Sequence, residues 1–136
     1  MKGLALVFLG AFVASTVNAE SLPINPGLWE TTMTRTDPFG GEPVTETQSK
    51  CVTETSFDPA TMMDGAQGCA ISQDDLEGNK LTFAMECDTH GAKSTMNGMY
   101  ETDGQTGTGD MEVQVKAAGM DMSMQMRWTT RRTGDC

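Results

Sequence analysis

From Gly68 onward, apolar and polar residues alternate almost without interruption along the chain. The clearest stretch is MDMSMQM, residues 120–126, in which methionine fills every second position and Asp121, Ser123 and Gln125 stand between. Successive side chains of a β-strand point to opposite faces, so this pattern gives a strand one apolar face and one polar face. The alternation therefore predicts antiparallel strands that bury one face and expose the other.

The same alternation recurs at residues 81–87, 111–117 and 120–128, and short glycine-containing breaks separate these segments: DTHGA, TDGQTG and AAGMD. Closer to the start, residues 27–36 and 44–52 also have the composition of strands, with a turn over 37–43. Several strands at such short spacing indicate a meander.

We therefore expect an all-β fold, an antiparallel meander of about seven strands. It either closes into a small barrel or forms a strongly curved sheet. One short helix is expected within residues 53–65. Either Asp58 is its N-cap and Pro59 its first residue, or Thr53 is the cap and Pro59 closes the turn.

The first 19 residues have the features of a secretory signal. A positive charge at Lys2 precedes an apolar run over residues 4–17, and small residues lead to Ala19. The run is shorter than the about 20 apolar residues of a membrane-spanning helix. We expect cleavage after Ala19 rather than retention as an anchor, and export to the periplasm. An extended leader at 20–26 and a single β-rich domain at 27–136 would remain.

The exported chain is strongly acidic. Loss of Lys2 with the signal takes the formal net charge from −10 to −11. Such a charge disfavours binding to nucleic acid and to anionic lipid. No second apolar run follows the signal, so we expect a soluble protein without a membrane span.

The four cysteines are Cys51, Cys69, Cys87 and Cys136. In an exported protein an even count indicates disulfides, and four cysteines allow three pairings. Cys69 and Cys87 each lie nine residues from Gly78, which stands in the turn sequence Glu-Gly-Asn. A hairpin about this turn places Cys69 opposite Cys87. The remaining pair joins Cys51 to Cys136.

The row of Met120, Met122, Met124 and Met126 is open to two interpretations. Its spacing is the strand period, so all four side chains point to one face, with Cα atoms about 6.6–6.8 Å apart for successive methionines. We expect core residues first, and in that case Met124→Ala costs about 2–5 kcal/mol. Thioether sulfurs also select copper(I). Met120 and Met122, directly after Gly119 at a strand end, are the residues of this alternative metal site.

Trp29 and Trp128 fall on the apolar faces of the first and last expected strands. A closed barrel would place these strands side by side, so the two rings would form either a core pair or one wall of a ligand pocket. Met124 and Met126 would complete such a pocket with an adaptable lining.

No catalytic constellation is readable in the sequence. His90 is the one histidine, and its spacing from Cys87 resembles that of metal ligands. Because structural zinc normally takes four nitrogen or sulfur ligands, we expect a solvated turn histidine instead. The basic cluster of Arg127, Arg131 and Arg132 is expected to pair with nearby carboxylates. We expect neither an enzyme nor a bound cofactor.

Three motifs carry a family resemblance: PGLWE at 26–30, CVT from Cys51, and RWTTRRTGDC at 127–136. With four cysteines and Met-rich strands between them, the chain resembles a family of small bacterial exported proteins classed as domain of unknown function 3617. The resemblance covers the whole mature chain. It implies an envelope location, a single β-rich domain and no known catalytic residue, and the family offers no established activity to transfer.

These features favour a non-catalytic binding or accessory module of the cell envelope, which holds an apolar ligand or meets an envelope partner. A periplasmic copper(I)-binding protein is the first alternative, and a hydrolase without a readable motif is the second. The direction of the methionine side chains distinguishes them. A filled interior favours a structural role, an open Met- and Trp-lined cavity favours ligand binding, and converging exposed sulfurs favour copper.

Overall fold

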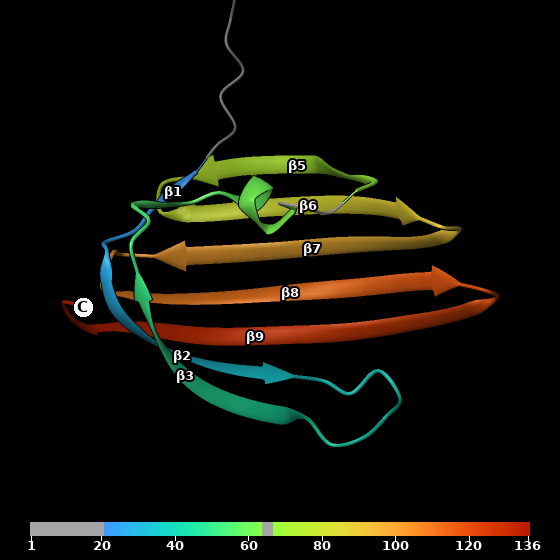
Figure 1. The fold of residues 1–136 in the computed structure, drawn as a ribbon, viewed down its shortest axis with the longest axis horizontal. Coiled ribbons are helices and arrows are strands. Elements are labelled where there is room, and N and C mark those ends of the chain that lie inside the picture. The colour runs from blue at the N-terminus through green and yellow to red at the C-terminus, as the bar shows by residue number, and fades with distance from the viewer. Residues whose placement is uncertain (1–20, 64–66) are drawn as a thin grey trace, which may run out of the picture.

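The computed structural model describes residues 21–63 and 67–136. Its main element is a seven-stranded antiparallel sheet in the order β3-β2-β9-β8-β7-β6-β5 (Figure 1). The strands are β2 (Gly27–Arg35), β3 (Val44–Val52), β5 (Cys69–Glu77), β6 (Lys80–Thr89), β7 (Ala92–Thr102), β8 (Thr106–Ala117) and β9 (Met120–Gly134). The expected all-β class and strand number are confirmed.

The strands from β5 to β9 form the expected meander, because each pairs with the next one along the chain. The β2–β3 hairpin then pairs with β9, so the first and last long strands lie side by side. Within the described ranges, β3 and β5 are the two edges and do not pair with each other. Of the two predicted forms, the curved open sheet is therefore the correct one (Figure 1).

Tight turns join the longest strands. His90 and Gly91 between β6 and β7 have φ of 52° and 81°, and Ala118 and Gly119 between β8 and β9 have φ of 50° and 77°. Two successive residues with positive φ match the right-handed twist of paired strands, as in type I′ hairpin turns.

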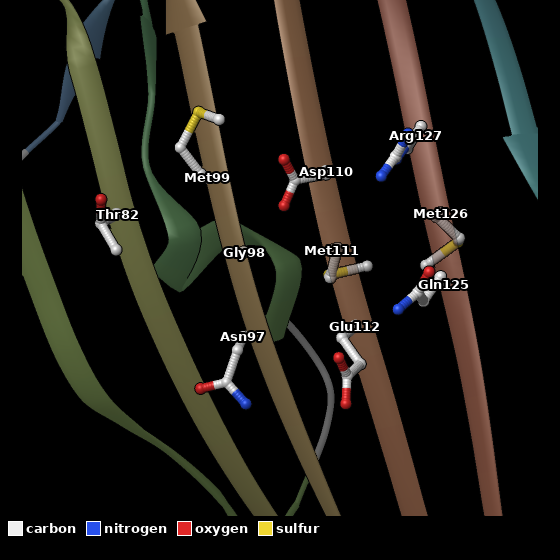
Figure 2. Close-up of a pocket in the computed structure, with 10 residues that line it drawn as sticks. All are labelled: Thr82, Asn97, Gly98, Met99, Asp110, Met111, Glu112, Gln125, Met126 and Arg127. Atoms are coloured by element: carbon white, nitrogen blue, oxygen red, sulfur yellow. The ribbon is translucent and has the colours of Figure 1, made fainter.

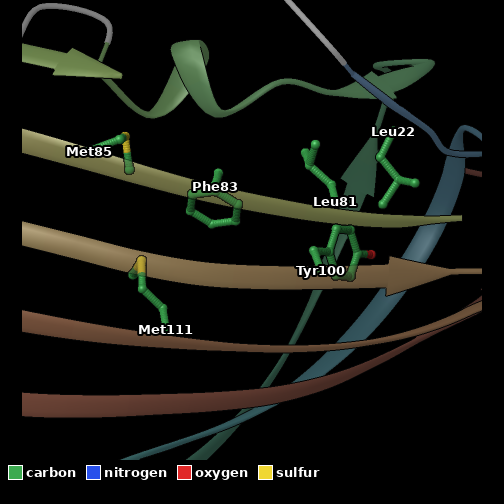
Figure 3. Packing of buried hydrophobic residues seen from close by; sticks show 6 residues of the cluster. All are labelled: Leu22, Leu81, Phe83, Met85, Tyr100 and Met111. Atoms are coloured by element: carbon green, nitrogen blue, oxygen red, sulfur yellow. The ribbon is translucent and has the colours of Figure 1, made fainter. Parts of the chain in front are cut away.

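The sheet has one apolar face, called here the inner face, and one polar outer face. Directly opposed residues of antiparallel strands share a face, and the register pairs Leu81 with Tyr100 and Met111 with Met126 on the inner one. The buried cluster on this face comprises Leu22, Leu81, Phe83, Met85, Tyr100 and Met111 (Figure 3).

Two short chain segments cover part of the inner face. They contain β1 (Leu22–Pro23), which pairs with β4 (Ser56–Phe57), and the 3-10 helix η1 (Pro59–Met63). We call these segments, residues 21–26 and 53–63, the strap. The Phe57 ring lies 6.0 Å from that of Phe83 and 5.3 Å from that of Tyr100, centroid to centroid. Leu22 is fully buried, so the segment expected as an extended leader also supplies a core residue.

The short helix follows the first of its two predicted starts. The Ala60 backbone N–H donates a hydrogen bond to Asp58 Oδ1 at 2.9 Å, and the Thr61 N–H donates to the Asp58 carbonyl oxygen. Asp58 thus caps the helix and Pro59 opens it. The alternative start at Thr53 is wrong, since the helix begins six residues later.

Three inner-face glycines make room for aromatic rings. A Cβ added at Gly98 would lie 2.5 Å from Phe83 Cζ, and one at Gly107 would lie 2.9 Å from Tyr100 Cε2. One added at Gly109 would overlap the Trp128 indole. The rings therefore lie directly against neighbouring strands, where no other residue type leaves space.

Both disulfides join the pairs that the spacing predicts. Cys69 and Cys87 are directly opposed on β5 and β6, with Cα atoms 4.0 Å apart. Cys51 near the end of β3 is bonded to Cys136, with Cα atoms 5.6 Å apart. The second bond ties the edge of the sheet to the residues that follow β9.

Strand β3 is exposed along nearly its whole length. The middle of its inner face carries Glu46, Gln48 and Lys50, opposite Met33, Thr31 and Trp29 of β2. The apolar face therefore ends at β2, and β3 forms a polar border.

The expected signal peptide, residues 1–19, lies outside the described residues and stays a prediction. Among the residues that the structure describes, no helix is long and apolar enough to cross a membrane.

Candidate functional site

A pocket opens on the inner face where the strap leaves the sheet uncovered. We call it the inner pocket. Its volume is about 280 Å³ and its surface is almost wholly apolar. It is lined by Thr31, Met33, Phe57, Phe83, Tyr100, Met111, Met126 and Trp128.

Strand pairing brings these residues together from distant parts of the chain. Met33 of β2 is opposite Trp128 of β9, and Met126 of β9 is opposite Met111 of β8. The Tyr100 ring lies 6.0 Å from the Trp128 ring, centroid to centroid, and extends the aromatic contact from Phe57 across the sheet. The pocket is therefore a surface of rings and thioethers, the groups that give apolar sites both area and adaptability.

The lining carries no formal charge. Burial raises the pKa of the Tyr100 phenol, and a hydrogen bond with the Thr102 side chain acts in the opposite direction. The phenol therefore stays neutral at physiological pH. The Thr31 and Thr130 hydroxyls are hydrogen-bonded to each other, with 3.0 Å between their Oγ1 atoms. These conditions suit an uncharged apolar ligand.

An ion pair stands at the border of this surface, toward β3. Arg35 Nη2 lies 3.6 Å from Glu46 Oε1, and the two side chains are 47% and 65% exposed. An apolar centre with a polar rim is the usual build of a small-molecule site.

The four residues of the expected pocket do not all lie in one pocket of the structure. Met126 and Trp128 line the inner pocket. Trp29 is 5% exposed and its Nε1 donates a hydrogen bond to the Asn25 carbonyl oxygen at 2.8 Å. Its strand partner is Arg132, whereas Trp128 is opposite Met33, so the register offsets the two indoles along the strands. Met124 lines a smaller cavity next to the inner pocket.

That smaller cavity, called here the end cavity, has a volume of about 110 Å³. It is lined by Pro38, Val113, Val115, Met122, Ser123 and Met124. Pro38 comes from the connection between β2 and β3, and the other residues come from β8 and β9.

The methionine row lies on the inner face but is buried to different extents. Met126 packs against the core cluster, and Met122 and Met124 are partly buried. Met120 is 56% exposed at the start of β9. The expectation of a core role therefore fails for Met120, which lies exposed at the first position of β9, beside the turn.

Truncation of these methionines should follow their burial. We expect Met124→Ala to lower the free energy of unfolding by about 1–2 kcal/mol, below the range for a fully buried methionine because Met124 is only partly buried. Met120→Ala, the matched control on the same strand, should change it by less than about 0.5 kcal/mol. Urea unfolding followed by circular dichroism measures both. A larger loss in Met120→Ala than in Met124→Ala would contradict this placement.

Sequence reasoning missed three aromatic residues of the inner pocket as site residues. Phe83 and Tyr100 lie in strands that the alternation predicts. The alternation shows which face of the sheet a side chain occupies, but not which side chains on that face come into contact. Phe57 is in the strap, where no pattern signals its contact with the sheet. The strongest available signal is glycine on the inner face of β7 and β8, since Gly98 and Gly109 mark where rings lie.

The outer face has a hollow of about 380 Å³ (Figure 2). Asp110 of β8 is opposite Arg127 of β9 there, and Glu112 is opposite Gln125. The Gln114 side-chain amide donates a hydrogen bond to Glu112 Oε1 at 2.6 Å. The hollow is open and mixed in polarity, as expected for the solvated side of an antiparallel sheet.

The basic cluster behaves largely as ion pairs. Arg131 Nη2 lies 3.2 Å from Glu30 Oε1, and Arg132 Nη2 lies 2.5 Å from Asp135 Oδ1. Arg132 Nε also donates to the Pro26 carbonyl oxygen at 2.9 Å. Arg127 lines the outer hollow.

His90 and Cys87, the two residues with the spacing of zinc ligands, do not form a metal-binding pair. His90 is exposed in the β6–β7 turn, and Cys87 is bonded to Cys69. In the described part of the chain, no group of three or more His, Cys, Asp and Glu side chains is arranged to hold a metal ion.

Comparison with known proteins gives one match. A family model described as "Protein of unknown function (DUF3617)" matches residues 24–136. No curated protein and no solved structure matches the chain. The matched range includes all seven strands of the sheet and both disulfides.

Proposed function

Since this chain belongs to the DUF3617 family, whose description assigns no function, we propose from its own site that it is a non-catalytic binding protein of the cell envelope. It holds a small apolar ligand in the inner pocket. The observation that carries the proposal is an uncharged, aromatic- and methionine-lined pocket of about 280 Å³ on a partly covered sheet. This volume is close to the lower end of the about 300–1,000 Å³ of small-molecule sites.

The proposed location is the periplasm. The signal-like pattern of the first 19 residues supports it. Two disulfides among the four cysteines also support it, because such bonds persist in oxidising compartments. The absence of a readable catalytic motif in the sequence supports the non-catalytic role.

Ligand binding has a direct test. Protein isolated from the periplasm and sprayed under native conditions should carry an apolar species, and the stripped protein should bind the neutral dye Nile red. Trp128→Ala should weaken dye binding by about tenfold, since truncation of a central aromatic residue of a site commonly costs more than 1 kcal/mol. Phe39→Ala is the control, because this aromatic residue is 79% exposed and outside the lining. A dye affinity equal in wild type and Trp128→Ala would refute the proposed site.

The second candidate function, copper(I) binding through thioethers, is favoured by one observation. Met120 is 56% exposed on the same face as the partly buried Met122, so one sulfur is accessible at a strand end. Against it, Met122 and Met124 pack around the end cavity with Val113 and Val115.

We expect titration with copper(I) under reducing conditions to show no tight stoichiometric binding. The reason is the spacing of same-face methionines along one strand, with Cα atoms about 6.6–6.8 Å apart, which does not by itself bring two sulfurs to one ion. Tight binding that Met120→Ala and Met122→Ala abolish, with stability unchanged in Met124→Ala, would establish the copper function instead.

A further inference from the structure

The inner pocket and the end cavity adjoin on the same face. Met111 and Met126 line the inner pocket and are opposite each other on β8 and β9. The next inner-face pair along these strands, Val113 and Met124, lines the end cavity. One inner-face step, about 6.6–6.8 Å along a strand, therefore separates the two cavities.

The two cavities together form an elongated apolar path. From Met122 to Trp128 the path follows six residues of β9, about 20 Å at a rise of about 3.3 Å per residue. A bilayer core of about 30 Å contains two layers of lipid tails, so one extended acyl chain is about 15 Å long. The path is long enough for a single chain, and its narrow end cavity of about 110 Å³ suits a linear group rather than a fused ring.

The two ends of the path differ. At the Trp128 end, Phe57 of the strap walls the inner pocket and packs against Tyr100. At the other end, beyond Met122, Met120 is 56% exposed beside the β8–β9 turn. The path therefore ends against aromatic rings at one end and reaches an exposed residue at the other.

We propose that the ligand is a single linear acyl chain that lies along β9, with its methyl end in the inner pocket and its polar end directed toward the β8–β9 turn. This rests on the proposed function and specifies its substrate class. Met124 and Met126 stand between the two cavities, and their unbranched side chains can turn aside to join them around a chain.

Chain length is the first test. Hexanol, decanol and the compact alcohol adamantanol should each displace Nile red from the oxidised protein. Affinity should rise about fourfold for each methylene that the path buries, so decanol should bind at least about tenfold more tightly than hexanol. Met122→Trp, which fills the end cavity, should remove this gain and leave the affinities for hexanol and adamantanol unchanged.

Two further variants keep this test interpretable. Val115→Phe fills the end cavity from β8 and should act like Met122→Trp, so a folding defect in one variant does not remove the test. Asp121→Trp places the same new side chain on the outer face of β9 and should keep the chain-length gain. Thermal unfolding of each variant verifies that it is folded.

Orientation is the second test. Decanol brominated at its methyl end should quench tryptophan fluorescence, and decanol brominated beside the hydroxyl should not. The difference should disappear in Trp128→Phe, in which Trp29 is the remaining tryptophan.

The outcomes separate the two proposals. If hexanol, decanol and adamantanol displace the dye equally, and the cavity-filling variants change nothing, the inner pocket binds ligands but the acyl-chain path is wrong. Equal quenching by both brominated alcohols overturns the orientation. If neither Nile red nor any alcohol binds the wild-type protein, the proposed function itself fails.

Discussion

Replacement of both Cys51 and Cys136 by serine is expected to lower the free energy of unfolding by about 4–5 kcal/mol. The bond closes a loop of 85 residues, and in the chain-entropy model a long loop gains most from closure because the unfolded chain loses most freedom. A domain of this size has a total stability of about 5–15 kcal/mol. The double variant should therefore lose about a third or more of its stability.

The second disulfide is the matched control. Replacement of both Cys69 and Cys87 by serine opens a loop of 18 residues, for which the same model gives about 3 kcal/mol. Urea unfolding without reductant, followed by circular dichroism, compares the two variants. A smaller loss from the Cys51–Cys136 bond than from the Cys69–Cys87 bond would show that loop closure does not govern the stability of this fold.

Phe83→Ala is expected to cost about 3–5 kcal/mol, the range for a large aromatic residue removed from a core. Phe83 is 1% exposed, and its ring fits against Gly98 of β7 and packs on Phe57 of the strap. Truncation therefore leaves a cavity that no neighbouring side chain of β7 fills, and it also loosens the strap.

The same substitution at an exposed phenylalanine provides the control. Phe39 is 79% exposed in the β2–β3 connection, so Phe39→Ala should change the unfolding free energy by less than about 0.5 kcal/mol. Chemical unfolding followed by circular dichroism gives both values. Equal costs for the two variants would mean that the core is not centred on Phe83.

Local pattern was sufficient for the strands and for one disulfide. The alternation in residues 81–87, 111–117 and 120–128 identifies β6, β8 and β9, because strand period depends only on neighbouring residues. The symmetry about Gly78 predicts Cys69 opposite Cys87, and these two residues are paired. Beside the turn the register is shifted by one residue, with Glu77 opposite Lys80, and a β-bulge between Ile71 and Gln73 restores the symmetric pairing at the cysteines. The Asp58–Pro59 start of η1 is equally local.

Long-range pairing could not be read from the same pattern. Whether the sheet closes depends on whether the edge strands β3 and β5 pair, and the local pattern of residues 44–52 and 69–77 does not decide this. Contact of Leu22 and Phe57 with the sheet depends on the path of the strap, which has no periodic signal. The candidate site was therefore located only in part, through Met126 and Trp128 on a strand that was recognised.

The burial of the methionine row shows the same limit. The strand period predicts that all four methionine side chains point to one face of the sheet, and the observed pairing of β8 with β9 confirms it. How deeply each is buried depends on what lies above it, and this changes along β9 from Met126 beside the core cluster to Met120 at the turn.

An open sheet leaves β3 with unpaired backbone groups along its free edge, and such edges invite other chains to add a strand and aggregate. The charged border of this protein opposes that reaction. A second copy that paired with β3 would lay its own apolar inner face against Glu46 and Lys50. Burial of these charged side chains costs free energy, even where Glu46 keeps its ion pair with Arg35. Side chains that contribute nothing to the core thus protect the sheet from polymerising edge to edge.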